Sequence, residues 1–177
     1  MPVYFKGDKI TPIVKDTSLF KKLADRSITE ITAEDLQGIN RLGNFVFWGC
    51  YDLMSITIPD SVIRINSYVC QACAKLTSII IPNSVTYVGY HSFYGCNGLT
   101  SVVIGNGLTH IDGEVFYNCT SLTSITINAT TPPTLSNANA FGNTNNCPIY
   151  VPAESVEAYK AATNWSTLAD RIFAIPQ

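Results

Sequence analysis

The chain has 177 residues, which is enough for one well-buried core and too few for two. Apolar residues make up 46% of it and charged residues only 14%, a balance typical of a folded protein and not of a disordered one. The formal net charge is −2 and no segment concentrates Lys or Arg, so neither nucleic acid nor an anionic membrane surface is expected as a partner.

Residues 1–38 are predicted to form an N-terminal cap. They begin without an apolar run long enough for a signal-peptide core, and the chain nowhere has 18 consecutive apolar residues. We therefore expect no export signal in this chain and no membrane insertion, and its localisation stays open. Within the cap, residues 16–26 have helical apolar spacing and residues 28–31 suit a strand. The spacing of Thr32 and Asp35 resembles a capping box, and Gly38 would end the short helix that this box begins.

Residues 39–128 contain four copies of a 23-residue repeat. Their clearest marker is a cysteine at each step: Cys50, Cys73, Cys96 and Cys119. A leucine follows each cysteine at the third position and β-branched residues follow at the sixth and eighth, giving L-x-x-I-x-I four times. One such coil cannot bury its apolar side alone, so identical positions of successive coils are expected to stack into a continuous core.

Each repeat divides into two halves with different apolar spacing. The alternating I-x-I half predicts a short strand that pairs in parallel with its counterpart in the next coil, and Pro59 and Pro82 end it directly after the last core residue. The V-x-F-x-x-C half has apolar residues three apart, which favours a helical or 3₁₀ turn on the opposite side of the coil.

Residues 129–177 are predicted to close the array with a degenerate repeat and a helical C-terminal cap. Phe141 marks the degenerate coil, and residues 149–151 supply its strand. A final helix is expected over residues 154–162, with Val156, Tyr159 and Trp165 covering the last coil.

The combined pattern A-F-x-x-C-x-x-L-T-S-I-x-I-P-x-S-V-x-x-I-G resembles the BspA-like leucine-rich repeat, and residues 91–101 read almost as its consensus. Residues 149–160 with Trp165 also look like the terminal cap common in that family. The resemblance implies an α/β solenoid of one domain, 1–177. In this fold a right-handed leucine-rich-repeat coil has short parallel strands on one face, helical or 3₁₀ turns on the other, and a cap at each end.

No residue set in the sequence predicts catalysis, a cofactor or a metal site. The stacked cysteines and the C-x-x-C pair Cys70 and Cys73 could suggest disulfides or zinc, but in-register side chains point the same way, and Cys70 occupies a core phenylalanine column. His91 and His110 are interpreted as surface histidines, and no P-loop, dinucleotide fingerprint or nucleophile motif occurs. We therefore expect a protein that is not an enzyme.

Two outward-facing columns are candidates for binding. The first lies on the strand face and consists of Thr57, Ile80, Val103 and Thr126. It is either a solvated sheet face built for β-propensity or a shallow docking surface centred on Ile80 and Val103. The second column is aromatic and comprises Trp48, Tyr94 and Tyr117, extended by Tyr68, Tyr87, Tyr90 and His91. Its rings either contact protein and carbohydrate ligands or pack on neighbouring coils and stiffen the stack.

The resemblance implies a non-catalytic binding or adhesion module on a bacterial surface, because members of the family are implicated in attachment to host proteins or to other cells. The expected partner is a protein or glycan on a host or neighbouring cell. The alternative is a structural subunit or tip domain of an assembly such as a phage tail. The sequence does not decide between these, and it leaves the oligomeric state open.

Overall fold

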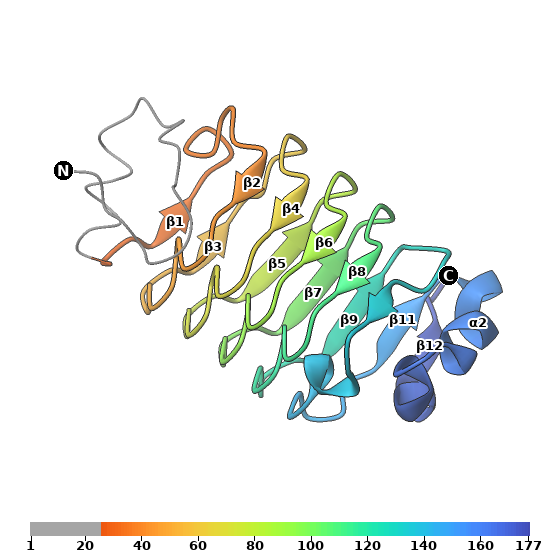
Figure 1. The fold of residues 1–177 in the computed structure, drawn as a ribbon. Helices are drawn as coiled ribbons and strands as arrows, with labels where there is room; N and C mark the ends of the chain where they lie inside the picture. Colours follow the sequence, from red (N-terminus) through yellow and green to blue (C-terminus); the bar gives the residue numbers. More distant parts are fainter. Residues whose placement is uncertain (1–25) are drawn as a thin grey trace.

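The computed structural model describes residues 26–177 and shows a stack of coils that runs from the N-terminal to the C-terminal end of the chain (Figure 1). In each coil the chain passes through one strand position, a turn and a second strand position before stepping to the next coil. The leucine-rich-repeat solenoid predicted from the 23-residue step is thereby confirmed. The helix predicted over residues 16–26 lies outside the described residues, apart from Arg26.

The longer strands form a five-stranded parallel sheet, in which the C-terminal strand was not predicted from the sequence and the other strands come from predicted strand segments. Its strands are β5 (Ser78–Ile81), β7 (Ser101–Ile104), β9 (Ser124–Ile127), β11 (Ile149–Val151) and β12 (Ile172–Ala174). The register keeps equivalent positions opposite one another, with Ile79 beside Val102 and Val102 beside Ile125. Before this sheet, β1 (Glu30–Ile31) pairs in parallel with β3 (Ser55–Ile56), so the strand expected over residues 28–31 is present and the coil stacking extends N-terminal to residue 39.

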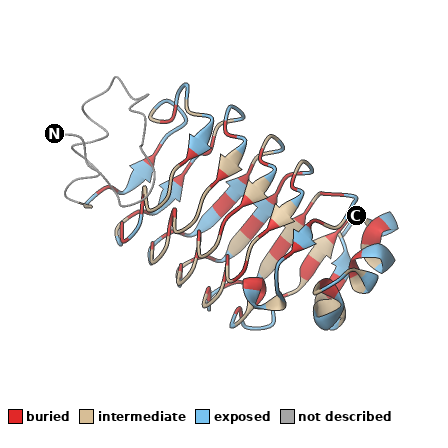
Figure 2. Cartoon of the chain, viewed as in Figure 1, coloured by how far each residue is buried: buried red, intermediate tan, exposed pale blue. Residues whose placement is uncertain are grey.

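A second parallel sheet, which the sequence did not lead us to expect, is built from strands of two residues. They are β2 (Arg41–Leu42), β4 (Arg64–Ile65), β6 (Tyr87–Val88), β8 (His110–Ile111) and β10 (Thr134–Leu135). Each strand has one buried apolar residue preceded by an outward one. The buried residues of both sheets face a shared core, and from β5 to β11 the longer strands alternate buried positions with exposed or half-buried ones (Figure 2).

The V-x-F-x-x-C half of each repeat forms consecutive turns with the i→i+3 hydrogen bonds of a 3₁₀ turn, as predicted, for example from the Cys73 N–H to the Cys70 carbonyl at 3.1 Å, but these turns do not extend into a helix. Two positions per repeat are left-handed, as in Tyr68 (φ 62°) and Ala72 (φ 62°), and this conformation prevents a helix from continuing. The turns also donate hydrogen bonds to the next coil, for example from the Cys70 N–H to the Ser92 carbonyl at 2.7 Å. Stacked turns therefore satisfy their backbone groups partly within the turn and partly between coils.

At the N-terminal side, the capping-box interpretation of Thr32 and Asp35 is confirmed although the helix is reduced to a turn. The Asp35 carboxylate accepts bonds from the Thr32 N–H and hydroxyl at 2.9 Å, and the Asp35 N–H donates to the Thr32 hydroxyl at 3.2 Å. Residues 33–38 are turn residues, and Gly38 ends them with a φ of 77°. Gly38 can adopt this left-handed conformation without the steric cost that a Cβ brings.

The C-terminal cap is helical, as predicted. After η1 (Ala138–Phe141) and β11, the chain forms η2 (Ala153–Ser155), α2 (Val156–Ala161) and η3 (Trp165–Arg171). Tyr159 and Trp165 are fully buried, and the partly buried Val156 packs against the same core. These residues cover the end of the stack that would otherwise be exposed. No helix in residues 26–177 combines the length and the apolar character needed to cross a bilayer.

Candidate binding surfaces

The outward column of the long sheet forms an exposed apolar row. Ile80 lies beside Val103, and Val103 beside Thr126, in neighbouring parallel strands. The row continues through Tyr150 to Phe173, because β11 pairs with β9 and with β12. Ile80 is 66% exposed, Val103 36% and Phe173 49%. The apolar part of this face is therefore longer than the two residues identified from the sequence.

The aromatic column at the turns packs mainly on itself. Tyr94 and Tyr117 stack with ring centroids 5.6 Å apart, and Tyr68 stacks on Phe45 at 4.5 Å. Phe45 was missed in the sequence, although it precedes Tyr68 by one full repeat step. These rings are half-buried, which supports the interpretation that they stiffen the stack while leaving their edges at the surface. Trp48 is more open, at 42% exposure, with the Arg26 guanidinium 5.0 Å from its ring.

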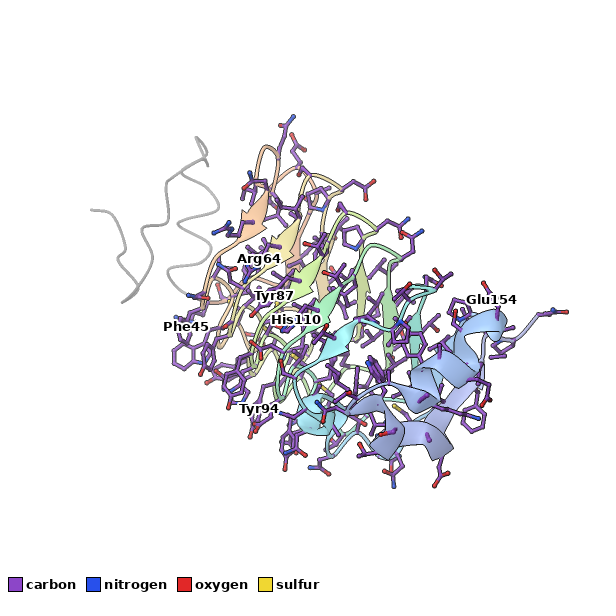
Figure 3. All side chains as sticks on the ribbon, turned by 45° about the vertical axis from the view of Figure 1, so that its right-hand side comes forward. Phe45, Arg64, Tyr87, Tyr94, His110 and Glu154 are labelled. Atoms are coloured by element: carbon purple, nitrogen blue, oxygen red, sulfur yellow. The ribbon has the colours of Figure 1, made fainter. Side chains whose placement is uncertain are left out.

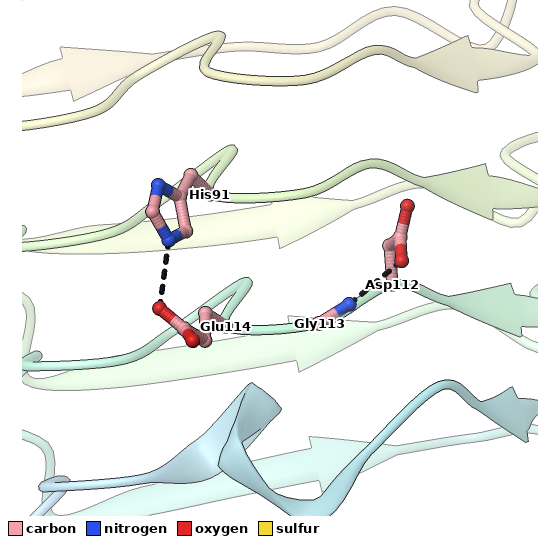
Figure 4. A network of polar contacts seen from close by, with 4 residues as sticks. All are labelled: His91, Asp112, Gly113 and Glu114. Atoms are coloured by element: carbon pink, nitrogen blue, oxygen red, sulfur yellow. Dashed lines mark hydrogen bonds and ion pairs between the residues drawn. The ribbon is translucent and has the colours of Figure 1, made fainter.

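His91 is not the surface histidine predicted from the sequence, because its side chain is only 15% exposed. The ring stacks on Tyr90 with centroids 3.8 Å apart and lies 4.4 Å from the ring of Tyr94. Its Nε2 lies 2.8 Å from the Glu114 carboxylate in the next coil, whereas Nδ1 is buried without a hydrogen-bond partner (Figure 4). Glu114 follows His91 by one repeat step, so the period of the sequence was the signal for this pair.

A separate polar row lies on the short-stranded sheet and includes Tyr87. In register across β2, β4, β6 and β8 stand Arg41, Arg64, Tyr87 and His110. Figure 3 shows the last three following one another along this surface, apart from Phe45 and Tyr94 at the turns. Tyr87 stacks on His110 with centroids 5.1 Å apart and lies under the Arg64 guanidinium at 3.5 Å. His110 is half-buried in this row.

Asp112 forms a hydrogen bond with the polar row. It accepts a hydrogen bond from the Tyr87 hydroxyl at 2.9 Å. It also accepts one from the Gly113 N–H at 2.8 Å (Figure 4). Burial raises the pKa of Tyr87, and its bond to Asp112 raises it further. Burial alone would raise the pKa of Asp112 too, but the bonds that it accepts outweigh this and lower its pKa. The tyrosine is therefore neutral and the aspartate charged near neutral pH.

The stacked cysteines pack in the core. The thiols of Cys73, Cys96 and Cys119 donate to backbone carbonyls of the preceding coil at 3.1–3.2 Å, in the order Phe47, Cys70 and Phe93. A small side chain that fills space and donates one weak hydrogen bond suits this position in every coil. In residues 26–177 no three His, Cys, Asp or Glu side chains are grouped so that they could hold a metal ion.

We expect all six cysteines to resist thiol reagents in the native protein. None of them is more than 4% exposed, and burial raises the pKa of Cys50 to about 11 and that of Cys147 above its ordinary value. Because the thiolate is the reactive form, a chromogenic aryl disulfide should react with less than about one thiol per chain at pH 8, and with all six in guanidinium. A thiol that reacts in the native protein as fast as free cysteine would contradict the buried column.

The solved structures that are similar to this chain include two leucine-rich repeat proteins. One, from Bacteroides ovatus ATCC 8483, is 23% identical with a TM-score of 0.43, over 73% of this chain and 40% of that chain. The other, a leucine rich cell surface protein from Faecalibacterium prausnitzii A2-165, is 17% identical with a TM-score of 0.30, over 89% of this chain and 62% of that chain. This chain thus spans less than two thirds of either protein.

A comparison with family models identifies the repeats directly. The model of the BspA type leucine-rich repeat region matches residues 18–164, with six copies, whereas no curated protein matches the chain. The matched residues include all of the strands from β1 to β11. The chain therefore belongs to the family of BspA-type leucine-rich repeat proteins.

Proposed function

We propose that the chain is a non-catalytic adhesion module of a bacterial surface and that it binds a protein through the outward face of the long sheet. The observation that carries the proposal is the exposed apolar row of that face. Large apolar side chains at 66% and 49% exposure, as in Ile80 and Phe173, do nothing for solubility. Membership of the BspA-type family agrees with a binding role, although family membership alone does not specify a ligand.

The composition of this face favours a protein ligand. Ile80, Val103 and Phe173 would form its apolar centre, and the strands of the long sheet carry a parallel column of small hydroxyl side chains beside them: Ser78, Ser101 and Ser124. An apolar and aromatic centre with a polar rim is the usual anatomy of a protein interface. The paired strands hold the row rigidly, so little conformational entropy would be lost on binding.

The test is a binding screen with the intact chain. The immobilised protein is exposed to purified extracellular-matrix proteins, mucins and intact cells, and saturable binding is measured by biolayer interferometry. We expect at least one protein ligand to bind, and the double variant Ile80→Glu/Val103→Glu to weaken its affinity by about ten-fold or more, because charges would replace the desolvated centre of the contact.

Thr86→Glu/Thr109→Glu is the matched control, since both threonines are exposed beside the short-stranded sheet and together add the same two charges away from the apolar row. It should leave the affinity within about two-fold of the original. If no probe binds saturably, or if both variants lose affinity equally, the proposal fails. Self-association of the chain with no binding of any probe would instead favour the assembly role.

A further inference from the structure

The short-stranded sheet carries an open hollow of about 330 Å³ that the apolar row does not explain. Its walls come from β2, β4, β6 and the turns that follow the first two of these strands. The lining side chains are all polar or charged, with the exception of the tyrosine ring: Arg41, Asn44, Arg64, Asn66, Ser67 and Tyr87. This volume is at the lower end of the range for small-molecule sites, and it suits a single sugar residue better than a peptide segment.

Two guanidinium groups lie on neighbouring coils at this hollow. Arg41 and Arg64 are direct register partners in β2 and β4, strands that parallel pairing holds about 4.8 Å apart. Like charges directly opposite one another on adjacent strands destabilise a sheet unless an anion compensates them. Among residues 26–177, neither guanidinium forms an ion pair with a carboxylate.

The acidic group that contacts Tyr87 already accepts two hydrogen bonds. The Asp112 carboxylate accepts bonds from the Tyr87 hydroxyl and the Gly113 N–H, and among residues 26–177 it forms no ion pair with Arg64. Arg64 itself is held in place, because its Nε donates to the Asn66 Oδ1 at 3.1 Å and its Cζ lies 3.5 Å from the centre of the Tyr87 ring. A guanidinium fixed in this way can bind an oxyanion with little loss of conformational freedom.

We propose that this hollow binds an acidic sugar residue, with the sugar carboxylate between Arg41 and Arg64. The Asn66 amide and the Ser67 hydroxyl would then pair with the sugar hydroxyls, since both side chains line the hollow and can donate hydrogen bonds. A peptide carboxylate fits this site less well, because the hollow offers only the Tyr87 ring as apolar surface for neighbouring side chains. The site is independent of the proposed protein contact, which lies on the other sheet.

The experiment is an NMR titration of the full, ¹⁵N-labelled chain with sodium glucuronate. We expect saturable shifts of the Asn66 and Ser67 amide signals and of the Arg64 Nε–H signal, and none with glucose, which lacks the carboxylate. The variant Arg41→Gln should raise the dissociation constant about ten-fold or more. Arg41 is exposed, so this variant is expected to fold, and its spectrum will report that.

Lys75→Gln is the matched control, because it removes an exposed cation whose only described partner is Asp52, in a pair outside the hollow. Its titration should be unchanged, and so should that of Ile80→Glu, which separates this site from the proposed protein contact. Equal shifts with glucose, or an unchanged dissociation constant in Arg41→Gln, would overturn the proposal. Acetate that binds as tightly as glucuronate would overturn the assignment to a sugar.

Discussion

Replacing Trp165 with alanine is expected to lower the free energy of unfolding by about 3–5 kcal/mol, the range for removing a large buried aromatic side chain. The indole is fully buried, and its Nε1–H donates to the Pro133 carbonyl at 2.7 Å. Its ring lies 5.6 Å from that of Phe141 and 5.0 Å from that of Tyr159. The substitution would leave both a cavity and an unsatisfied carbonyl at the end of the stack. Urea unfolding followed by circular dichroism measures the resulting loss of unfolding free energy.

Trp48→Ala is the matched control, since it removes the other of the two tryptophans. Trp48 is 42% exposed and its described ring contact is with Arg26, so its removal should cost no more than about 1 kcal/mol. Both substitutions remove a tryptophan, so a difference between their losses of unfolding free energy reports the position of the side chain and not its type. Equal losses from the two substitutions would show that the C-terminal cap does not stabilise the array.

The repeat step made the core predictable. Every coil has a coil of the same shape on each side, so a residue at one position meets its equivalent at the next, and burial at one step implies burial at the others. Ile79, Val102 and Ile125 are in register and at most 1% exposed, as the alternating pattern predicted. The cap residues Tyr159 and Trp165 were also predicted correctly, because an apolar end face requires large apolar cover.

The short-stranded sheet and the shape of the turns could not be predicted in the same way. A two-residue strand has no periodicity to detect, and it exists only because the next coil supplies its hydrogen bonds. At the left-handed position of Tyr68 no repeat has glycine or asparagine, so stacking between coils, not residue type, determines the conformation there. At the position of Ala72, by contrast, the other repeats have Gly49, Gly95 and Asn118, which favour a left-handed backbone, and this signal in the sequence was missed. The burial of His91 could not be predicted either, because it depends on aromatic rings from its own turn and from the preceding coil.

The candidate surfaces were predictable in part. Ile80 and Val103 were identified as outward-facing because they alternate with buried residues. Tyr150 was missed because its distance from Thr126 along the chain differs from the repeat step, and Phe173 lies in a strand after the helical cap, where no further coil was expected. The hollow between Arg41 and Arg64 depends on side-chain geometry and could not be predicted. The separation of these arginines by one repeat step was visible in the sequence, but we considered the aromatic residues instead when we identified outward-facing columns.

Leu99→Ala is expected to lower the free energy of unfolding by about 2–5 kcal/mol. Leu99 is fully buried in a central coil, so both neighbouring coils would lose packing against it. Because solenoid stability is a sum of coil and interface contributions, a lesion in the middle weakens two interfaces where a terminal lesion weakens one. Urea unfolding should show a lower midpoint with an unchanged m-value if the coils still unfold together.

Ile80→Ala is the control for this prediction, because it truncates an aliphatic side chain of the long sheet that is 66% exposed instead of buried. Its cost should stay below about 1 kcal/mol, mainly from the lower β-propensity of alanine. A similar loss from both substitutions would contradict the assignment of inward and outward strand positions. A loss confined to Leu99→Ala means that Ile80 contributes little to folding, and its exposure on the sheet is then left to be explained by a ligand.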